Sequence, residues 1–316
     1  MEGSHIRRVA VIGTGVIGAS WASLFLARGL DVVASDPAPD AEAALRRTVE
    51  AHWPAMERMG PAPDASVDRL RFASSIEAAV ADAQWVQENG PERLDLKRDL
   101  FRALDEAAPL DAVFASSTST LRVSEFQDAC ARRPERVVLG HPFNPPHLIP
   151  LVEVAGGENT SEDAVERALA FYKALGKHPI RLRKEIRGHV ANRLQAALWR
   201  EAFHLVASGV ASVADVDAAI AHGPGLRWSL LGPFLNLHLS GGAGGIGALF
   251  DKPLWRATEG MWRDLGEVSV DAALGEAVAR GVAAELGSRD VDEMVRERDA
   301  TLLGLLEAKA SARNLP

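Results

Sequence analysis

The residues best suited to chemistry are a histidine and a glutamate that lie close together in the chain. His141 lies in the run VLGHPFNP of residues 138–145, and Glu153 follows it by twelve residues. The ordinary pKa of histidine lies nearest to neutral pH, so this side chain can take up or release a proton. A carboxylate on one ring nitrogen fixes the tautomer and makes the other nitrogen more basic. The two residues therefore predict a proton-transfer pair, with His141 as the base.

A glycine-rich turn near the N-terminus indicates a second functional element besides the proton-transfer pair. Residues 9–12 (VAVI) are typical of a strand buried on both faces, and the turn GTGVIG of residues 13–18 follows directly. Residues 19–28 have helical spacing, Gly29 ends that helix, and the next apolar run, 31–36, ends in an acid. A strand, a glycine turn, a helix and a second strand within about 30 residues indicate a βαβ unit.

Each glycine of this turn has a physical role in dinucleotide binding. Gly13 permits the tight turn, Gly15 lets the backbone approach a pyrophosphate, and Gly18 lets the helix pack closely on the strand. The phosphates would then bind free N–H groups at the start of the helix, including those of Val16 and Ile17. We therefore predict a dinucleotide site at residues 13–18.

Asp36 predicts which dinucleotide binds. It ends the second strand, 18 residues beyond Gly18, and no arginine follows it directly. A carboxylate accepts hydrogen bonds from the ribose 2′-hydroxyl and repels a 2′-phosphate, so NAD is favoured over NADP. A base and a hydride acceptor in one chain indicate a dehydrogenase.

The elements that position these residues are predicted from alternating apolar and charged stretches. Apolar runs recur at residues 85–87, 113–115, 137–139 and 152–154. Helix-like stretches separate or follow them, notably 95–108 and a segment that begins at 160–163 and ends near Leu175, with Gly176 as C-cap. Such alternation is typical of a parallel sheet with helices on both faces.

After Arg187 the apolar residues recur at helical spacing, and few β-branched runs remain. The sequence therefore predicts an α/β fold with two domains. A Rossmann-type, doubly wound and mostly parallel sheet forms the NAD-binding domain in residues 1–187. An all-helical C-terminal domain for substrate binding and dimerisation follows in residues 188–316.

Composition excludes several classes of function. The 316 residues carry a net charge of −8, which argues against binding to a nucleic-acid backbone. Cys130 is the only cysteine, so no intrachain disulfide and no thiolate metal cluster can form, and we expect no metal site. Neither a run of 18 apolar residues nor an N-terminal signal-peptide pattern occurs. We expect a cytoplasmic protein that binds a small molecule and no membrane.

Five motifs, in this order, resemble the 3-hydroxyacyl-CoA dehydrogenase family, and the likeness runs from about Arg8 to about Gly242. The motifs are Gly13–Gly18, Gly90-Pro91-Glu92 with Lys97, Phe114–Ser119, Gly140–Pro145 with Glu153, and Gly188–Arg193. The resemblance implies a homodimer that pairs through the helical domain.

The resemblance also implies roles for individual residues. His141 and Glu153 would be the catalytic pair, and Ser119 and Asn192 would hydrogen-bond the reacting oxygen. Further cofactor contacts would fall on Glu92, Lys97 and Asn144. Structural alternatives stay open: Ser119 as a helix or turn cap, Asn144 as a turn residue, and Lys97 as a solvated helix charge.

Two departures from the motifs of the acyl-CoA enzymes favour a branch acting on small free hydroxy acids. His189 stands where those enzymes usually carry an aromatic residue, and the run GPGLRW of residues 223–228 also differs. In this part of the chain the residues resemble those of L-carnitine and L-gulonate dehydrogenases and of lambda-crystallin. The likeness to the carnitine enzymes is the strongest.

That branch makes four further residues candidates for substrate contacts. Arg227 could bind a substrate carboxylate through its guanidinium fork. Trp199, Trp228 or Phe143 could face a quaternary ammonium group through a cation–π contact. The alternatives are an interdomain ion pair for Arg227 and ordinary core positions for the tryptophans.

The leading prediction is an NAD-dependent dehydrogenase that oxidises the 3-hydroxyl of a small L-3-hydroxy acid to the 3-keto acid. Carnitine-like, gulonate-like and 3-hydroxybutyrate-like substrates stay open. One alternative is an L-3-hydroxyacyl-CoA dehydrogenase that acts on the thioester. Another is a non-catalytic, crystallin-like or NAD-sensing protein, against which the intact His141, Glu153, Ser119 and Asn192 argue.

Overall fold

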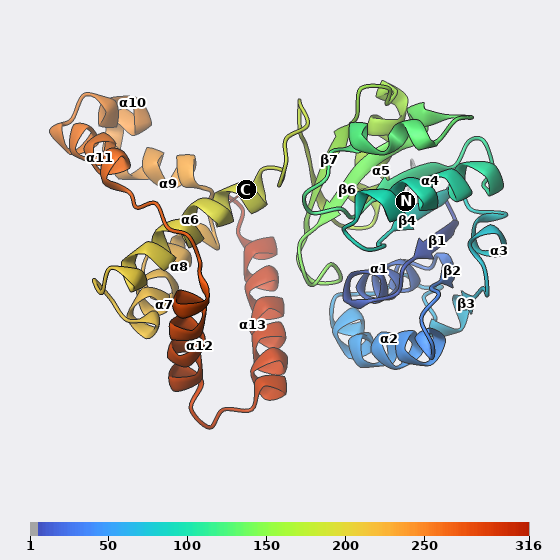
Figure 1. Cartoon of the computed structure of the whole chain (residues 1–316), viewed down its shortest axis with the longest axis horizontal. Coiled ribbons are helices and arrows are strands. Elements are labelled where there is room, and N and C mark those ends of the chain that lie inside the picture. The colour runs from blue at the N-terminus through green and yellow to red at the C-terminus, as the bar shows by residue number, and fades with distance from the viewer. Residues whose placement is uncertain (1–5, 316) are drawn as a thin grey trace. The chain divides into compact units, whose positions relative to one another are not determined.

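The computed structural model describes residues 6–315, which form two units (Figure 1). The first unit ends at Arg193 and the second begins at Leu194. Helix α6 (Ala191–Ala207) spans this division. The domain boundary predicted between residues 187 and 188 lies a few residues earlier, in the segment that leads into α6.

The first unit is built on an eight-stranded sheet with the order β3-β2-β1-β4-β5-β6-β7-β8. Neighbouring strands pair in parallel except β6 and β7, which are antiparallel. The order from β3 to β6 is that of a doubly wound dinucleotide-binding sheet, so the predicted fold class is confirmed. The strands are β1 (Arg8–Ile12), β2 (Asp31–Ser35), β3 (Leu70–Phe72), β4 (Trp85–Glu88), β5 (Val113–Ser116), β6 (Val137–Pro142), β7 (Leu151–Gly156) and β8 (His178–Arg181).

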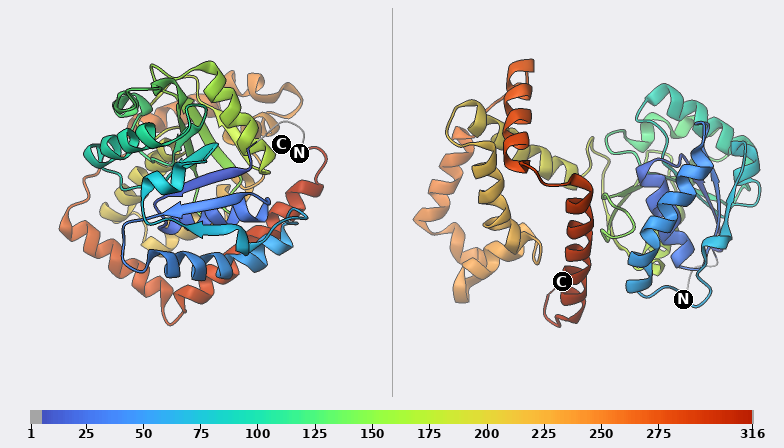
Figure 2. Two further views of the ribbon diagram at one scale, coloured as in Figure 1. Left: turned by 90° about the vertical axis from the view of Figure 1, so that its right-hand side faces the viewer. Right: turned by 90° about the horizontal axis from the view of Figure 1, so that it is seen from below.

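Helices cover both faces of this sheet (Figure 2). On one face lie α1 (Val16–Ala27) and α5 (Glu162–Ala174), and α2 (Ala41–Arg58) packs on α1. On the other face lie α3 (Ile76–Val80) and α4 (Leu94–Ala107). Strand side chains alternate between the faces, and this alternation decides which polar residues can meet at the carboxyl ends of the strands.

Each face of the sheet has its own apolar core. Between α1, α5 and the sheet, Trp21 stacks on Phe25 with ring centroids 5.3 Å apart, and Trp85 lies 4.3 Å from Phe171. On the opposite face, Phe101 of α4 packs against Phe126 at 4.7 Å. These two layers fix the helices whose ends border the candidate site.

The predicted start of α5 is confirmed, and its C-cap lies one residue before the predicted Gly176. The hydroxyl of Ser161 accepts a hydrogen bond from the N–H of Ala164 at 3.1 Å and caps the helix. Leu175 is the C-cap, and Gly176 follows with a φ of +80°. Gly29 likewise adopts a positive φ directly after the C-cap of α1.

Within residues 194–315 the second unit contains helices and no strands. None of the helices in the described part of the chain is both long enough and apolar enough to cross a membrane. After α6 the helices are α7 (Val213–Ala221), α8 (Pro224–Trp228), α9 (Pro233–Ser240), α10 (Gly245–Phe250), α11 (Pro253–Asp264), α12 (Ala272–Leu286) and α13 (Val291–Ser311).

Candidate active site

The antiparallel pairing of β6 and β7 brings the proposed base and its carboxylate together. The register places His141 directly opposite Glu153, and residues opposite one another project on the same face of a sheet. Nδ1 of His141 lies 2.8 Å from Oε2 of Glu153, with side-chain exposures of 5% and 0%. The pair is thus buried, and the strand register holds it.

The second carboxylate oxygen of Glu153 is also occupied. Oε1 accepts hydrogen bonds from the backbone N–H groups of Val190 at 2.8 Å and Ala191 at 3.0 Å, at the start of α6. Burial acts to raise the pKa of Glu153, but hydrogen bonds from His141, Ala191 and Val190 outweigh it and lower that pKa below its ordinary value. Glu153 is therefore ionised at neutral pH.

An ionised carboxylate only accepts hydrogen bonds, so the proton on the imidazole of His141 lies on Nδ1. Its Nε2 then keeps a lone pair. No residue within 6–315 hydrogen-bonds to that Nε2. The arrangement is that of a base whose reactive nitrogen is left for another molecule.

The segment at the start of α6 also contacts the loop that follows β5. The side-chain amide of Asn192 donates to the carbonyl of Ser119 at 3.2 Å, and Nε2 of His189 lies 2.9 Å from the carbonyl of Thr118. The structure thus brings Ser119 and Asn192 together through a backbone carbonyl, while the two residues before Asn192 bind the side chain of Glu153. The four residues predicted to be catalytic lie on four segments, β6, β7, the loop after β5 and the start of α6, and hydrogen bonds tie these segments together.

The glycine turn has the shape that a pyrophosphate requires. Gly13 has a φ of +86°, and a Cβ there would lie 2.7 Å from the carbonyl oxygen of Asn89. A Cβ on Gly18 would lie 1.9 Å from the carbonyl oxygen of Gly13, whereas at Gly15 it would meet nothing within 4 Å. Backbone atoms therefore leave no room for a side chain at Gly13 or Gly18, whereas the space beside Gly15 is empty.

The start of α1 is left free for an anion. Gly15 is its N-cap, so no side chain caps the first N–H groups, and the first turn has no acidic residue. Val16 is 70% exposed at this end. Free N–H groups and the positive end of the helix dipole together favour phosphate, so the residues present fit the predicted dinucleotide.

Asp36 lies beside the same turn. Its Oδ2 accepts hydrogen bonds from the N–H of Thr14 at 2.7 Å and its hydroxyl at 3.2 Å, and its Oδ1 accepts from the N–H of Ala38 at 2.9 Å. The carboxylate is half-buried, so part of it stays accessible. Asp36 thus anchors the glycine turn and keeps a negative charge next to it.

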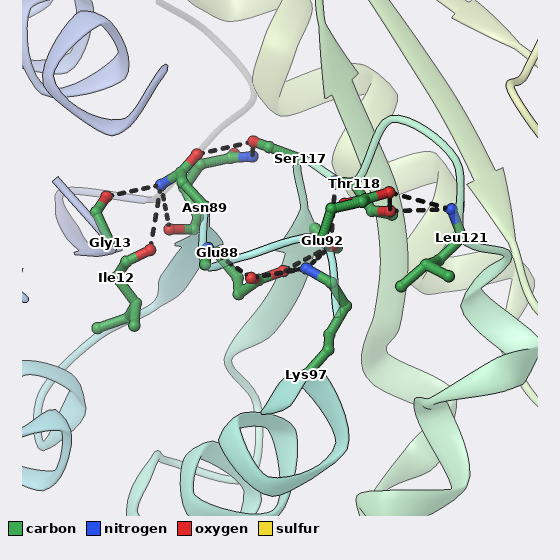
Figure 3. A network of polar contacts seen from close by, with 12 residues as sticks. Ile12, Gly13, Glu88, Asn89, Glu92, Lys97, Ser117, Thr118 and Leu121 are labelled. Carbon is green, nitrogen blue, oxygen red and sulfur yellow. Dashed lines mark hydrogen bonds and ion pairs between the residues drawn. The ribbon is translucent and has the colours of Figure 1, made fainter. Parts of the chain in front are cut away.

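A polar network that the sequence did not predict connects this turn to the loop after β5 (Figure 3). The side-chain amide of Asn89 donates to the carbonyls of Ile12 at 3.3 Å and Gly13 at 3.4 Å, and its oxygen accepts from Ser117 at 2.7 Å. Gln87 donates to the carbonyl of Gly140, next to His141, at 3.3 Å. The sequence offers one indication of such a role for Gln87 and Asn89: both are polar residues that end or follow the apolar run of β4.

Glu92 organises the loop after β5 from the other side. One oxygen of Glu92 accepts hydrogen bonds from the hydroxyls of Thr118 at 2.6 Å and Thr120 at 2.7 Å and from the N–H of Thr120 at 2.7 Å (Figure 3). Burial acts to raise the pKa of Glu92, but these hydrogen bonds lower it overall. Its predicted contact with the cofactor stays a prediction.

Lys97 lies on the first turns of α4 and is 1% exposed. Its Nζ lies 2.8 Å from both carboxylate oxygens of Glu88, and Ser116 donates to the same carboxylate at 2.5 Å. The alternative of a solvated helix charge is therefore wrong, because the residue forms a buried ion pair. A direct contact between Lys97 and a dinucleotide would require that pair to open.

The loop of residues 143–150 joins β6 to β7 and carries two further candidates. Phe143 packs edge-on against His141 with ring centroids 5.7 Å apart, and Asn144 is exposed. Ser20 of α1 accepts a hydrogen bond from the N–H of His147 at 2.8 Å. Lys177 donates to two carbonyls of the loop, and burial, with a smaller effect of Arg28, lowers its pKa to about 7.

The remaining candidates lie in the second unit. Trp199 on α6 and Trp228 on α8 are 53% and 46% exposed, so the alternative of core positions for the tryptophans is wrong. Arg227 is exposed on α8. In residues 6–315 no group of three or more His, Cys, Asp or Glu side chains is placed to hold a metal ion.

Comparisons with known proteins match most of the chain. The family model described as "3-hydroxyacyl-CoA dehydrogenase, NAD binding domain" matches residues 8–186, and its "C-terminal domain" model matches residues 188–285. The expectation that the likeness ends near Gly242 is therefore wrong.

Curated relatives and a solved structure agree with these models. L-carnitine dehydrogenase of Streptomyces griseus subsp. griseus is 51% identical over 303 residues, 96% of this chain and 90% of that protein. The enzyme of that name from Pseudomonas sp is 48% identical over 98% of this chain and 96% of its own length. The crystal structure of FHMPC 5-dehydrogenase, an NAD+-dependent dismutase, has a TM-score of 0.83 at 29% identity and covers 98% of this chain and 100% of that one.

Proposed function

The chain belongs to the 3-hydroxyacyl-CoA dehydrogenase family, and we propose that it oxidises the 3-hydroxyl group of L-carnitine or a closely similar small L-3-hydroxy acid. It is an NAD-dependent oxidoreductase. The observation that carries the proposed chemistry is the buried His141–Glu153 pair, whose Nδ1–Oε2 distance is 2.8 Å. The names of relatives that are about half identical over nearly the whole chain support the substrate.

In the proposed mechanism, His141 removes the proton of the substrate hydroxyl through Nε2. NAD held at the glycine turn of residues 13–18 would supply the acceptor for the hydride on the carbon that bears this hydroxyl. Glu153 then stabilises the positive charge that His141 acquires, because its Oε2 already accepts the Nδ1–H hydrogen bond. Hydrogen bonds from Ser119 and Asn192 would hold the reacting oxygen near the base.

We assign the quaternary ammonium group of the substrate to the face of Phe143. In L-carnitine this group is attached to the carbon next to the carbinol, so its partner must lie close to the base. Among the three aromatic candidates, Phe143 is the one in direct contact with His141, at 5.7 Å between ring centroids. Such a contact is worth about 0.5–2 kcal/mol. Arg227 remains our candidate for the carboxylate, and Trp199 and Trp228 remain further candidates for the cation.

The experiment that tests the function follows the absorbance of NADH formed from NAD with four alcohols. They are L-carnitine, L-gulonate, L-3-hydroxybutyrate and L-3-hydroxybutyryl-CoA, and D-carnitine is the matched control for L-carnitine. Turnover of L-carnitine and not of D-carnitine is the expected result. Turnover of the thioester alone would contradict the proposal and favour the acyl-CoA activity for which the matching family model is named.

We also propose a cytoplasmic location, which the lone buried thiol of Cys130 and the requirement for NAD support.

We further propose a homodimer formed through the second unit. In this unit α10 contacts both α9 and α11. Large apolar side chains project from these helices into solvent, and such a surface commonly marks an interface. The most exposed are Phe234 at 75%, Leu239 at 67%, Met261 at 58% and Trp262 at 58%. A monomer in light scattering at micromolar concentration would contradict the dimer.

The cofactor preference gives a prediction for Asp36. Asp36→Asn keeps an acceptor for Thr14 and removes the negative charge, so kcat/KM with NADP should rise about tenfold relative to NAD. The reason is that one like-charge contact is worth on the order of 1 kcal/mol in water and more at lower dielectric. Asp36→Ala should in addition raise KM for NAD, because the anchor of the glycine turn is lost.

Steady-state kinetics with both dinucleotides measure this change in preference. The matched control is Asp31→Asn at the opposite end of β2, where the carboxylate pairs with Arg69 at 2.7 Å. This control should leave the preference unaltered. An unaltered NADP-to-NAD ratio in Asp36→Asn would remove Asp36 from the ribose.

A further inference from the structure

The candidate site contains a second histidine that the proposed mechanism does not use. His189 is 2% exposed, and its ring centroid lies 5.0 Å from that of His141. It comes directly before the residues whose N–H groups bind Glu153. A buried imidazole in contact with the proposed base requires a physical account.

The backbone at His189 is strained. His189 has a φ of +53° and follows Gly188, which has a φ of +73°. A residue other than glycine in this left-handed region costs about 1–3 kcal/mol and persists only where the surroundings fix it. In this chain, the hydrogen bonds of the next three residues fix it, to Glu153 from Val190 and Ala191 and to Ser119 from Asn192.

The side chain of His189 adds a fourth contact to the same segment. Its Nε2 lies 2.9 Å from the carbonyl oxygen of Thr118, and because a carbonyl only accepts, Nε2 carries the proton. Burial lowers the pKa of His189, and the ionisable groups that face it are His141, Glu153 and Glu92. The ring is therefore neutral, and its N–H is committed to Thr118.

Residues 189–192 thus hold two parts of the site at once. The side chains of His189 and Asn192 bind the successive carbonyls of Thr118 and Ser119, while the N–H groups between them bind Glu153. Because Glu153 is hydrogen-bonded to His141, this short segment sets the distance between Ser119 and the base. Loss of one contact would let the loop after β5 move relative to β6.

We propose that His189 is a positioning residue for the oxidation, which holds the Thr118–Ser119 segment against His141 so that both reach the same substrate oxygen. This inference rests on the proposed function. It requires that His189 act on the rate of the chemical step and not on the binding of NAD, since its side chain bonds the carbonyl of Thr118, whereas the tie between this loop and the glycine turn runs through Ser117 and Asn89.

Two variants test this role without straining the backbone. Glycine adopts a positive φ without cost, so His189→Gly should fold while it loses the donor to Thr118. Asparagine also tolerates the left-handed region and supplies an amide N–H, so His189→Asn should recover part of the function. His178→Asn, at an exposed histidine at the start of β8, is the matched control.

We expect kcat of His189→Gly to fall about 100-fold, because a misplacement of about 1 Å costs roughly that factor. The dissociation constant for NADH, followed by its fluorescence, should stay unaltered. The deuterium isotope effect with substrate labelled at C3 should rise, because hydride transfer becomes slower than product release. His189→Asn should regain about tenfold of the lost kcat, and His178→Asn should behave like the unaltered protein.

Each of two results would overturn the proposal. One is an unaltered kcat in His189→Gly, and the other is an equal loss in His189→Asn and His189→Gly when thermal unfolding shows that both are folded. The comparison uses whichever of the four alcohols the unaltered protein oxidises. Failure with L-carnitine therefore counts against the proposed substrate, whereas the variants decide the role of His189.

Discussion

His141→Ala should lower kcat by about 1,000-fold and leave the dissociation constant for NAD nearly unaltered. A positioned general base contributes about 100- to 10,000-fold, and His141 has the one nitrogen in the buried pair that is left for substrate. The predicted NAD contacts at Gly13–Gly18 lie on a different strand and turn, so they should survive the change.

Steady-state kinetics and a titration with NADH, followed by its fluorescence, measure the two effects separately. His178→Ala is the control, because His178 is exposed and its side chain takes no part in the site. His141→Gln is a second variant that keeps an amide near Glu153 and fills most of the space. A near-native kcat in either His141 variant would refute the assignment of the base.

Glu153→Gln should reduce kcat by about 1,000- to 10,000-fold although it alters few atoms. The amide oxygen of glutamine can still accept from Val190 and Ala191, but its NH2 group would then face Nδ1 of His141. Because an NH2 group donates, Nδ1 must accept, and the imidazole proton then lies on Nε2. In this tautomer Nε2 has no lone pair and cannot act as a base. A wrong tautomer of this kind in a Ser-His-Asp triad costs about 10,000-fold.

The same substitution should alter stability on the acid side. The folded-state pKa of Glu153 is lowered, so its ionised form stabilises the fold fully above the ordinary pKa of glutamate. That contribution is lost as the pH falls through the folded-state pKa. The free energy of unfolding measured with urea should therefore fall more in acid for the unaltered protein than for Glu153→Gln. The control is Glu158→Gln at an exposed position.

Two results would contradict this role of Glu153. A kcat within tenfold of the unaltered enzyme would show that the tautomer of His141 does not depend on Glu153. The same acid-side slope in both proteins would show that Glu153 does not titrate as the structure requires.

The sequence predicted the parts of the fold that follow from local periodicity. The runs at β1, β2, β4, β5 and β6 are apolar because both faces are buried, so each was detectable by itself. β3 (Leu70–Phe72) was missed because it is only three residues long, which is too short for a measurable periodicity. β8 (His178–Arg181) is as long as β4 and β5 but is only partly buried, so it lacks their apolar run.

The reversal of β7 was not predicted, although the spacing holds a signal. Eight residues separate the end of β6 at Pro142 from the start of β7 at Leu151. A parallel connection needs a crossover of about a dozen residues or more, so this interval favours an antiparallel return. The antiparallel return brings β7 beside β6, and the register of the pair, which loop length alone does not determine, places His141 opposite Glu153.

The supporting contacts of the site were beyond sequence reasoning for a different reason. The ion pair of Lys97 with Glu88 and the contact of His189 with Thr118 join residues 9 and 71 positions apart. Such contacts depend on how helix and loop ends meet once the sheet has formed. Residue type alone left a solvated charge open at Lys97 beside the predicted cofactor contact, and it gave no role to His189.

The register that pairs His141 with Glu153 has a consequence for how such enzymes diversify. The two residues meet across paired strands, so the hairpin loop between them can be rewritten in composition, and even in length, without parting them. A single residue inserted within β7 before Glu153 would instead turn the carboxylate to the opposite face. Selection can therefore alter residues 143–150 beside the proposed base while the His141–Glu153 pair is inherited intact.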